Sequence, residues 1–140
     1  VTENADREAR KIIRQAKRLN PNSSIIDTGC YAQLKPEELA AIKEVDMIFG
    51  AKEKFNLLDH LDSIELNHKT KLFHSEINSV SHFEPSFSSN DRTRSYLKVQ
   101  DGCDYKCTYC TIPLARGRSR SDTLQNVINN AKKISKKDTQ

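Results

Sequence analysis

The sequence predicts an α/β fold, in which a parallel sheet with flanking helices precedes the strand, loop and helix that open a second unit. Three observations support this prediction. Helical apolar spacing alternates with short apolar runs over residues 2–64. Residues 63–92 then lose this periodicity and contain Ser, Asn and His instead. After them come one alternating run, three closely spaced cysteines and one amphipathic stretch.

The first elements alternate between helix and strand. We expect a helix over residues 2–20, where Ala, Ile and Leu recur at helical spacing before Asn20-Pro21 stops it. "SSIIDT" predicts a short buried strand that ends in a turn at Gly29-Cys30. A second helix is expected over residues 35–45, with Pro36 in its first turn.

The same alternation continues to residue 64. "DMIFG" predicts a second strand that ends at Gly50, and residues 52–64 predict a third helix. "TKLFHS" is a candidate for one further strand. The α-β-α-β-α order implies parallel strands, and functional loops of such sheets lie at the carboxyl ends of the strands. Cys30 is expected at one of these ends.

The second unit contains one strand, one loop and one helix. "SYLKVQ" alternates as a strand does, and residues 121–137 predict a helix with Asp122 as its N-cap. We therefore expect an α/β domain over residues 1–62, a linker over 63–92 with a boundary near residue 90, and the second unit over 93–140. One such unit cannot bury both its faces. Because the chain also starts at Val1, we expect it to be a piece of a longer protein.

Composition limits the class of protein. The chain has 140 residues, of which 36% are hydrophobic and 30% charged, enough for one ordinary domain or two small ones. No apolar run is long enough to span a bilayer, and no basic start precedes an apolar stretch as in a secretory signal. The cysteines are clustered rather than spread to staple loops, which favours free thiols in a reducing cytoplasm.

Charge is distributed unevenly along the chain. Residues 92–140 contain eleven Lys and Arg against four Asp and Glu, whereas residues 1–91 contain twelve against fifteen. This asymmetry favours a polyanionic partner for the second part, with a solvated basic face as the alternative.

The three clustered cysteines have the spacing Cys103-x3-Cys107-x2-Cys110. Three thiolates on one loop can ligate three irons of a [4Fe–4S] cluster and leave the fourth iron open to an exogenous molecule. A structural zinc site is an alternative, although the sequence has no second ligand pair. A redox pair of Cys107 and Cys110 is another, but it would leave Cys103 unexplained. Cys30, taken alone, is typical of a buried inert thiol.

The residues around these cysteines resemble a known family. "RSYLKVQDGCDYKCTYCTIPLARGRSRS", with Tyr109 before Cys110, is similar to the radical S-adenosylmethionine methylthiotransferases. The "IPLARGRSRS" end resembles most the MtaB-type enzymes that act on threonylcarbamoyladenosine in tRNA. "VTENADREAR" and "TGCYAQ" resemble two stretches of that family's N-terminal domain.

The resemblance implies a set of cofactors. Cys103, Cys107 and Cys110 would hold the [4Fe–4S] cluster that binds S-adenosylmethionine, and Tyr109 would lie near the adenine. Cys30 would be the third ligand of a second [4Fe–4S] cluster, whose other two ligands would precede Val1. The second unit would open a partial (β/α) barrel, and an external electron donor would reduce the cluster. Asp101-Gly102 would shape the turn into the loop, with Gly102 at positive φ.

The resemblance also implies a substrate. The parent protein would methylthiolate carbon 2 of threonylcarbamoyladenosine near the tRNA anticodon in the cytoplasm, without a membrane partner, and the piece alone would be inactive. Arg116, Arg118 and Arg120 would meet RNA phosphates, with a solvated loop as the alternative. The other substrates left open are isopentenyladenosine in tRNA and an aspartate of a ribosomal protein. An alternative of another class is a non-catalytic Fe–S or zinc protein that binds RNA.

Overall fold

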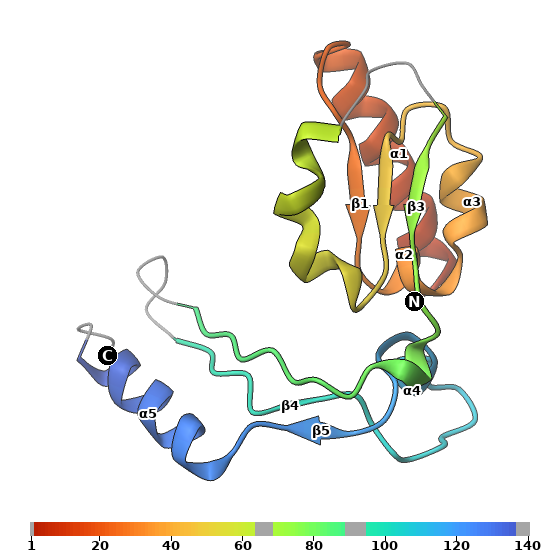
Figure 1. The fold of residues 1–140 in the computed structure, drawn as a ribbon. Helices are drawn as coiled ribbons and strands as arrows, with labels where there is room; N and C mark the ends of the chain where they lie inside the picture. The colour runs from red at the N-terminus through yellow and green to blue at the C-terminus, as the bar shows by residue number, and fades with distance from the viewer. Residues whose placement is uncertain (1, 64–68, 89–94, 137–140) are drawn as a thin grey trace.

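The computed structural model of the chain describes residues 2–63, 69–88 and 95–136 and has the expected α/β architecture (Figure 1). Three short parallel strands form one sheet in the order β1-β2-β3. Ile26 of β1 pairs with Met47 of β2, and Met47 in turn pairs with Lys71 of β3. The strands are β1 (Ile26–Thr28), β2 (Met47–Phe49) and β3 (Lys71–Phe73). The strand that "TKLFHS" suggested is therefore the third strand of the sheet.

The first helix, α1 (Glu3–Leu19), confirms the expected element. Thr2 caps it, and its hydroxyl oxygen accepts a hydrogen bond from the Ala5 backbone N–H at 3.3 Å. Acidic side chains in its first turn and basic side chains in its last turn complement the helix dipole. The helix ends at Asn20, directly before Pro21.

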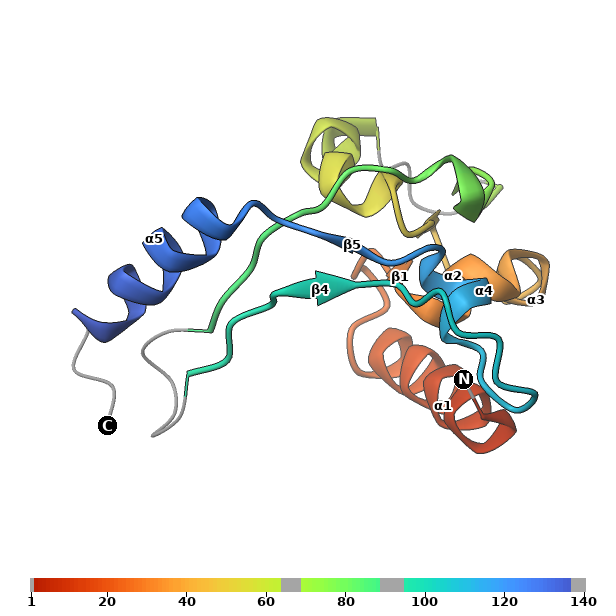
Figure 2. The same cartoon turned by 90° about the horizontal axis from the view of Figure 1, so that it is seen from below.

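The two faces of the sheet are covered by different helices, with α1 on one side and the 3-10 helix η1 (Glu53–Ser63) on the other (Figure 2). Ile48 packs into the core beside Ile13 of α1 and the fully buried Leu39. The next residue along β2, Phe49, points to the other face because side chains alternate along a strand. There its ring stacks on Phe73 at 4.8 Å between centroids.

The short helices after β1 differ from the expected elements. Gly29-Cys30 was expected to form a turn, but Cys30 begins α2 (Cys30–Leu34). Lys35 breaks this helix with φ −141° and ψ 53°, because a residue before proline is disfavoured in the α conformation. The helix expected over residues 35–45 is shorter, since α3 (Pro36–Ala40) ends before the buried Ile42.

The third expected helix is present, but as the 3-10 helix η1 rather than an α-helix. The apolar side chains that were expected to hold it are largely outside the core. Phe55, Leu58 and Leu61 are all classed as exposed, and Leu58 retains 75% of its accessible surface. Packing therefore imposes little regular geometry on this segment.

The second part of the chain contains little regular structure. The strand expected over "SYLKVQ" is reduced to an isolated bridge between Leu97 and Phe87 and a two-residue strand further on. Val99 of this segment is 51% exposed. The elements are η2 (Ile77–Ser79), β4 (Gln100–Asp101), α4 (Ile112–Arg116), β5 (Arg120–Ser121) and α5 (Leu124–Ser135), with β4 and β5 antiparallel.

The last helix begins one residue later than expected. Thr123, not Asp122, is the N-cap of α5, and its hydroxyl accepts a hydrogen bond from the Asn126 backbone N–H at 3.3 Å. Asp122 instead accepts a hydrogen bond from the Thr123 backbone N–H at 2.7 Å. Asp122 thus stabilises the turn before the helix, and Thr123 is the N-cap residue.

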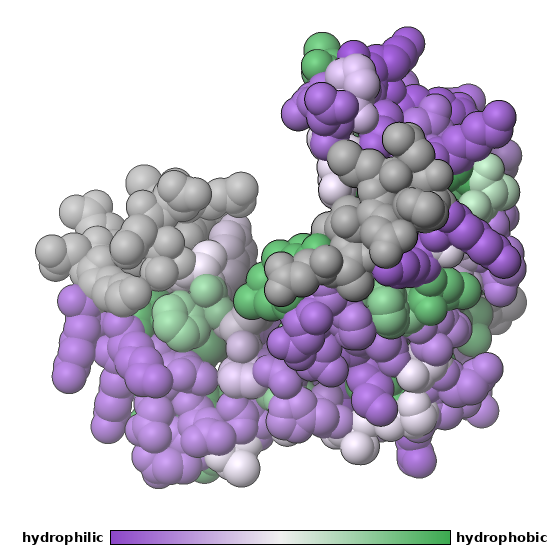
Figure 3. Space-filling view, turned by 45° about the horizontal axis from the view of Figure 1, so that its top comes forward, coloured by the Kyte–Doolittle hydropathy of each residue, from purple (hydrophilic) through white to green (hydrophobic). Residues whose placement is uncertain are grey.

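The two parts of the chain meet where α4 packs against α2, at the end of the sheet where β1 runs into α2 (Figure 1). The domain boundary expected near residue 90 lies outside the described residues. Hydrophilic residues cover most of the face drawn in Figure 3, and its hydrophobic patches are separate from one another. In the described part of the chain, no helix has both the length and the hydropathy to cross a bilayer.

Leu39 tests the packing of this fold. Its side chain is fully buried beside the sheet, so Leu39→Ala should lower the free energy of unfolding by about 2–5 kcal/mol in urea denaturation. Leu58→Ala removes the same atoms from a side chain that is 75% exposed and should change it by less than about 0.5 kcal/mol. Equal losses in the two variants would contradict the placement of Leu39 in the core.

Candidate functional site

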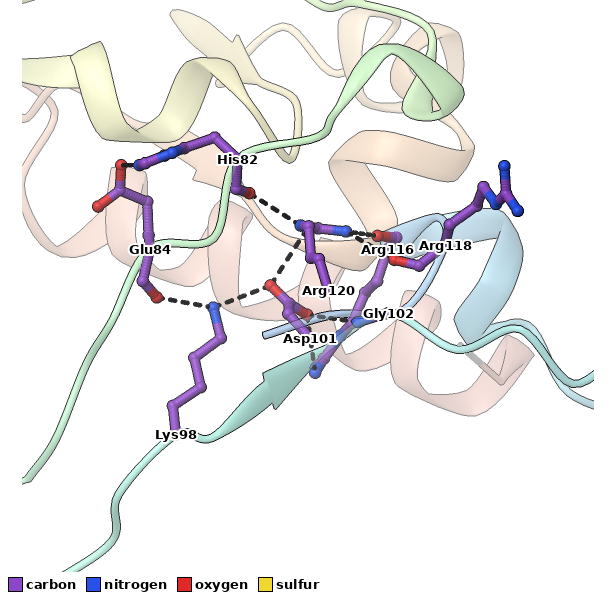
Figure 4. Close-up of polar contacts among 8 residues, drawn as sticks. All are labelled: His82, Glu84, Lys98, Asp101, Gly102, Arg116, Arg118 and Arg120. Atoms are coloured by element: carbon purple, nitrogen blue, oxygen red, sulfur yellow. Dashed lines mark hydrogen bonds and ion pairs between the residues drawn. The ribbon is translucent and has the colours of Figure 1, made fainter. Parts of the chain in front are cut away.

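The cysteine loop is anchored at its start by an ion cluster around the mostly buried carboxylate of Asp101 (Figure 4). Asp101, the last residue of β4, directs one carboxylate oxygen at Lys98 Nζ at 2.8 Å and at Arg120 Nη2 at 3.3 Å. Its other oxygen lies 3.9 Å from Arg116 Nη1 and accepts a hydrogen bond from the Gly102 backbone N–H at 3.0 Å. One carboxylate thus holds three cations.

Burial acts to raise the pKa of Asp101, since its side chain is only 11% exposed. The hydrogen bond from Lys98 and the charges of Lys98 and Arg120 outweigh burial, so the pKa of Asp101 lies below its ordinary value. The carboxylate is therefore charged at neutral pH and is a fixed point of the site.

The loop leaves Asp101 through a turn that requires glycine. Gly102 has a φ of +71°, as its expected role demands, and an added Cβ would lie 2.1 Å from the Arg118 carbonyl oxygen. Cys103 donates its backbone N–H to the Gly117 carbonyl at 3.0 Å. The Ser119 backbone N–H donates to the Asp104 carboxylate, also at 3.0 Å. These bonds fasten the beginning of the loop to the segment that follows α4.

The structure brings the three clustered cysteines to one hollow. Cys103, Cys107 and Cys110 all line a cavity of about 930 Å³, which we call the cysteine cavity. All three are free thiols. Cys107 is exposed, whereas Cys103 and Cys110 are partly buried. Cys107 and Cys110 are joined by a turn, in which the Cys110 backbone N–H donates to the Cys107 carbonyl at 3.1 Å. This turn places both cysteines at the same cavity.

The donor set of this cavity is of the kind that an Fe–S cluster takes, three cysteine thiols. Among the described residues, no three His, Cys, Asp or Glu side chains are placed to share one metal ion. A [4Fe–4S] cluster binds each thiolate to a different iron, so its ligands must border one cavity without converging on one atom. Three thiols on one open cavity meet that requirement.

The other expected site residues lie in different surroundings. Tyr109 lies in the loop between Cys107 and Cys110, is 92% exposed and is not among the residues that line the cysteine cavity. Arg118 is also exposed, with its Nε 3.9 Å from Asp104. Arg120 is instead only 11% exposed, and it donates to the backbone carbonyls of His82 and Arg116 at 2.9 and 2.6 Å as well as to Asp101. Of these two arginines, Arg118 has the guanidinium that faces solvent.

Cys30 lies away from the cysteine cavity, at the expected carboxyl end of β1, where it begins α2. Arg116 of α4 lines a smaller cavity together with Cys30, and its interaction with Cys30 is the largest cause of the raised pKa of Arg116. Because Arg116 also reaches Asp101, it joins the fourth cysteine to the anchor of the other three.

Sequence reasoning missed two basic residues of this region. Lys98 holds Asp101 and also donates to the Glu84 carbonyl at 3.1 Å. Lys54, near the start of η1, lines a smaller cavity with Cys30 and Arg116. Lys98 carries a weak signal, since it precedes Asp101 by three residues in a strand-like segment. Lys54 carries none, because only the fold brings residue 54 next to residues 98–120.

Comparisons with known proteins agree with the site. Residues 1–50 match the family described as "Uncharacterized protein family UPF0004". The threonylcarbamoyladenosine tRNA methylthiotransferase MtaB of Aquifex aeolicus is 40% identical over 140 residues, which cover 98% of this chain and 34% of that protein. The MtaB of Thermotoga maritima is 44% identical over 126 residues, covering 89% of this chain and 28% of that protein.

A second group of relatives is named for another substrate. The ribosomal protein uS12 methylthiotransferase RimO of Trichodesmium erythraeum is 30% identical over 115 residues, covering 81% of this chain and 26% of that protein. The chain is thus similar to methylthiotransferases over most of its length. It spans about a third of the length of the MtaB relatives it matches.

The low pKa of Asp101 predicts how stability depends on pH. A lowered pKa contributes stability that is fully present above about pH 4, the ordinary pKa of an unfolded Asp, and that is lost as the pH falls through the lower folded value. Asp101→Asn should therefore cost about 3 kcal/mol of unfolding free energy at neutral pH, because three cations lose their counter-charge. The difference from the native chain should shrink below about pH 4.

Asp104→Asn is the matched control. Asp104 is 61% exposed and has one ion pair, to Arg118, so its loss should cost less than about 1 kcal/mol. Urea denaturation of the three proteins across this pH range gives the comparison. A pH-independent difference between Asp101→Asn and the native chain would refute the charged role of Asp101.

Proposed function

We propose that this chain is the cluster-binding segment of a radical S-adenosylmethionine methylthiotransferase that modifies threonylcarbamoyladenosine in tRNA. The observation that supports this most directly is that Cys103, Cys107 and Cys110 border one cavity of about 930 Å³ on a loop with fixed ends. The relatives with the highest identities reported above carry the matching substrate in their names.

In this proposal the three thiolates hold a [4Fe–4S] cluster and leave one iron open for S-adenosylmethionine. The bound cluster, reduced by an external electron donor, supplies the one-electron chemistry that starts the reaction. The chain itself positions the thiols. Asp101 and Gly102 fix where the loop departs, and the Cys103–Gly117 backbone bond fixes where it returns.

Two exposed groups beside the cavity have roles in ligand binding. The ring of Tyr109 is free to lie against the adenine of S-adenosylmethionine, since it is 92% exposed. Arg118 lines the cysteine cavity and presents an exposed guanidinium that can pair with an RNA phosphate. Arg120 acts through the Asp101 cluster instead, because its donors are engaged there and with backbone carbonyls. Arg116 lies 3.9 Å from Asp101 but remains 54% exposed, so its guanidinium can also meet a phosphate.

The second candidate substrate is an aspartate of a ribosomal protein, which the RimO relatives at 30–33% identity favour. Two findings favour tRNA. The MtaB relatives named above reach 40–44% identity, and the excess of basic residues after residue 92 suits a polyanion. A cytoplasmic enzyme follows from either substrate.

Anaerobic reconstitution with iron and sulfide tests the cluster. The chain should take up about four irons and show a paramagnetic signal that changes when S-adenosylmethionine is added. Cys103→Ala should lose that signal, because two thiolates on one loop do not hold the cluster. Cys30→Ala is the thiol-matched control, since Cys30 lines a different cavity, and it should retain the iron.

Two outcomes would overturn the cluster assignment. One is about one zinc per chain without iron uptake, which would identify a structural zinc site. The other is equal loss of iron in Cys103→Ala and Cys30→Ala, which would place the cluster elsewhere.

A chimera tests the substrate separately. In a Bacillus subtilis strain that lacks its own MtaB, this chain would replace the matching segment of that relative, which is 38% identical over 138 residues. Mass spectrometry of tRNA nucleosides should then find methylthiolated threonylcarbamoyladenosine again, and the Cys103→Ala chimera should not restore it. A native chimera that is expressed and loaded with iron but leaves tRNA unmodified would contradict the tRNA assignment.

A further inference from the structure

The wall of the cysteine cavity carries polar side chains that are not needed to hold a cluster. Besides the three thiols, it is lined by the charged groups of Asp104, Lys106 and Arg118 and by the side chain of Asn78. A cluster ligated by thiolates uses none of these groups as ligands. They are therefore available to select the molecule that enters the cavity beside the cluster.

Lys106 provides the unpaired charge of this wall. It lies on the cysteine loop directly before Cys107, at an exposed position. Asp104 lies 3.9 Å from Arg118 and accepts a hydrogen bond from the Ser119 backbone N–H at 3.0 Å. In the described part of the chain, no carboxylate forms an ion pair with the ammonium group of Lys106. A cation so placed favours a ligand that brings an anionic oxygen into the cavity.

Asn78 reaches the same cavity from η2. Among the described residues that line the cavity, it is the one that comes from outside residues 103–118. The segment η2 packs against α4, and a Cβ added at Gly117 would lie 3.0 Å from the Ile77 carbonyl oxygen, so the two backbones are close. The structure describes no hydrogen-bond partner for the Asn78 side chain. Its amide can offer donors and an acceptor to a neutral polar group.

The substrate proposed above carries groups that match both side chains. The N6 substituent of threonylcarbamoyladenosine contains a neutral carbamoyl group and a carboxylate. Carbon 2 and the carbon that bears N6 flank the same ring nitrogen, so a base that presents carbon 2 to the cofactor brings its N6 substituent to the walls of the same cavity. Isopentenyladenosine carries a hydrocarbon there and would leave both side chains unpaired, which weakens binding.

We propose that Lys106 and Asn78 are specificity-determining residues that bind the threonylcarbamoyl group, Lys106 through the carboxylate and Asn78 through the carbamoyl group. S-adenosylmethionine also has a carboxylate, but its amino and carboxylate groups are the ones suited to ligate the open iron. This inference rests on the function proposed above and deepens it, because it names the groups that separate threonylcarbamoyladenosine from isopentenyladenosine.

The purified, iron-loaded Bacillus subtilis chimera described above provides the test. Its substrates are two RNA anticodon stem-loops, one with threonylcarbamoyladenosine and one with the methyl ester of the same carboxylate. Lys106→Gln should raise the KM for the first RNA about tenfold, the effect of losing one charge-assisted hydrogen bond, and should leave kcat nearly unchanged. The native chimera should lose a similar factor on the ester. Lys106→Gln should treat the two RNAs alike, because the ester lacks the charge that the lysine binds.

Lys132→Gln is the matched control for the lysine. It makes the same charge change in the basic part of the chain, at an exposed position of α5 that lines neither cavity, and should retain the native KM and the native discrimination. Asn78→Leu tests the amide at nearly constant volume. It should raise the KM for both RNAs about fivefold, the effect of one neutral hydrogen bond, and should still discriminate between them, since both RNAs keep the carbamoyl group.

Three results would overturn the proposal. The first is a Lys106→Gln chimera that discriminates between the two RNAs as the native chimera does. The second is a loss of iron, or of the signal change with S-adenosylmethionine, in Lys106→Gln, because the ammonium group would then serve the cluster or the cofactor. The third is an Asn78→Leu chimera with the native KM, which would remove the amide from the site.

These failures are distinguishable from failure of the proposed function. A native chimera that is loaded with iron and modifies neither RNA would contradict the proposed substrate, and the inference drawn from that substrate would fall with it. A native chimera that modifies the first RNA, together with a Lys106→Gln variant of unchanged KM, would refute the role of Lys106 alone.

Discussion

The second part of this chain depends on one buried carboxylate. Without Asp101, the basic groups of Lys98, Arg116 and Arg120 would face one another at the junction of β4, β5 and α4, and water would screen the half-exposed Arg116 better than the other two. With Asp101 present, its carboxylate attracts these cations and holds β4 and β5 together at the point where the cysteine loop begins. Since no apolar core is formed in this part of the described chain beyond Phe83 and Ala115, the ion cluster does the fastening that hydrophobic packing does around the sheet.

Such a clamp suits a loop whose middle must accept a cofactor. The ends are fixed by short polar contacts, from Gly102 to Asp101 and from Cys103 to Gly117. Between them the thiols border an open cavity and make no disulfide. Ligands for a cluster must be close to their final places but still able to move onto their irons, so rigid ends with an adaptable middle are a reasonable compromise.

The sequence predicted correctly those elements whose signals lie within a few neighbouring residues. The α1 helix has a cap, helical spacing and a proline stop within twenty residues, and the parallel sheet follows from the alternation of elements. The predictions were wrong where the structure of a segment depends on contacts with residues far away in the sequence. The 3-10 geometry of η1 follows from weak packing, and the loss of the "SYLKVQ" strand follows from the lack of a sheet partner. The cysteine spacing could be read directly, whereas the pairing of Arg116 with Cys30 joins residues 86 positions apart and has no signature in sequence.

The short helix α4 is the wall that the two cavities share. Pro113 and Leu114 line the cysteine cavity, whereas Ala115 and Arg116 line the smaller cavity beside Cys30 and Lys54. Residues two positions apart on a helix point in different directions, so five residues suffice to present an apolar face to the thiols and a cation to the other side. Since α4 also packs on α2, a displacement of Cys30 and its helix would move the wall of the cysteine cavity. The contacts that connect the two cysteine sites therefore run through Arg116 and the packing of these two helices.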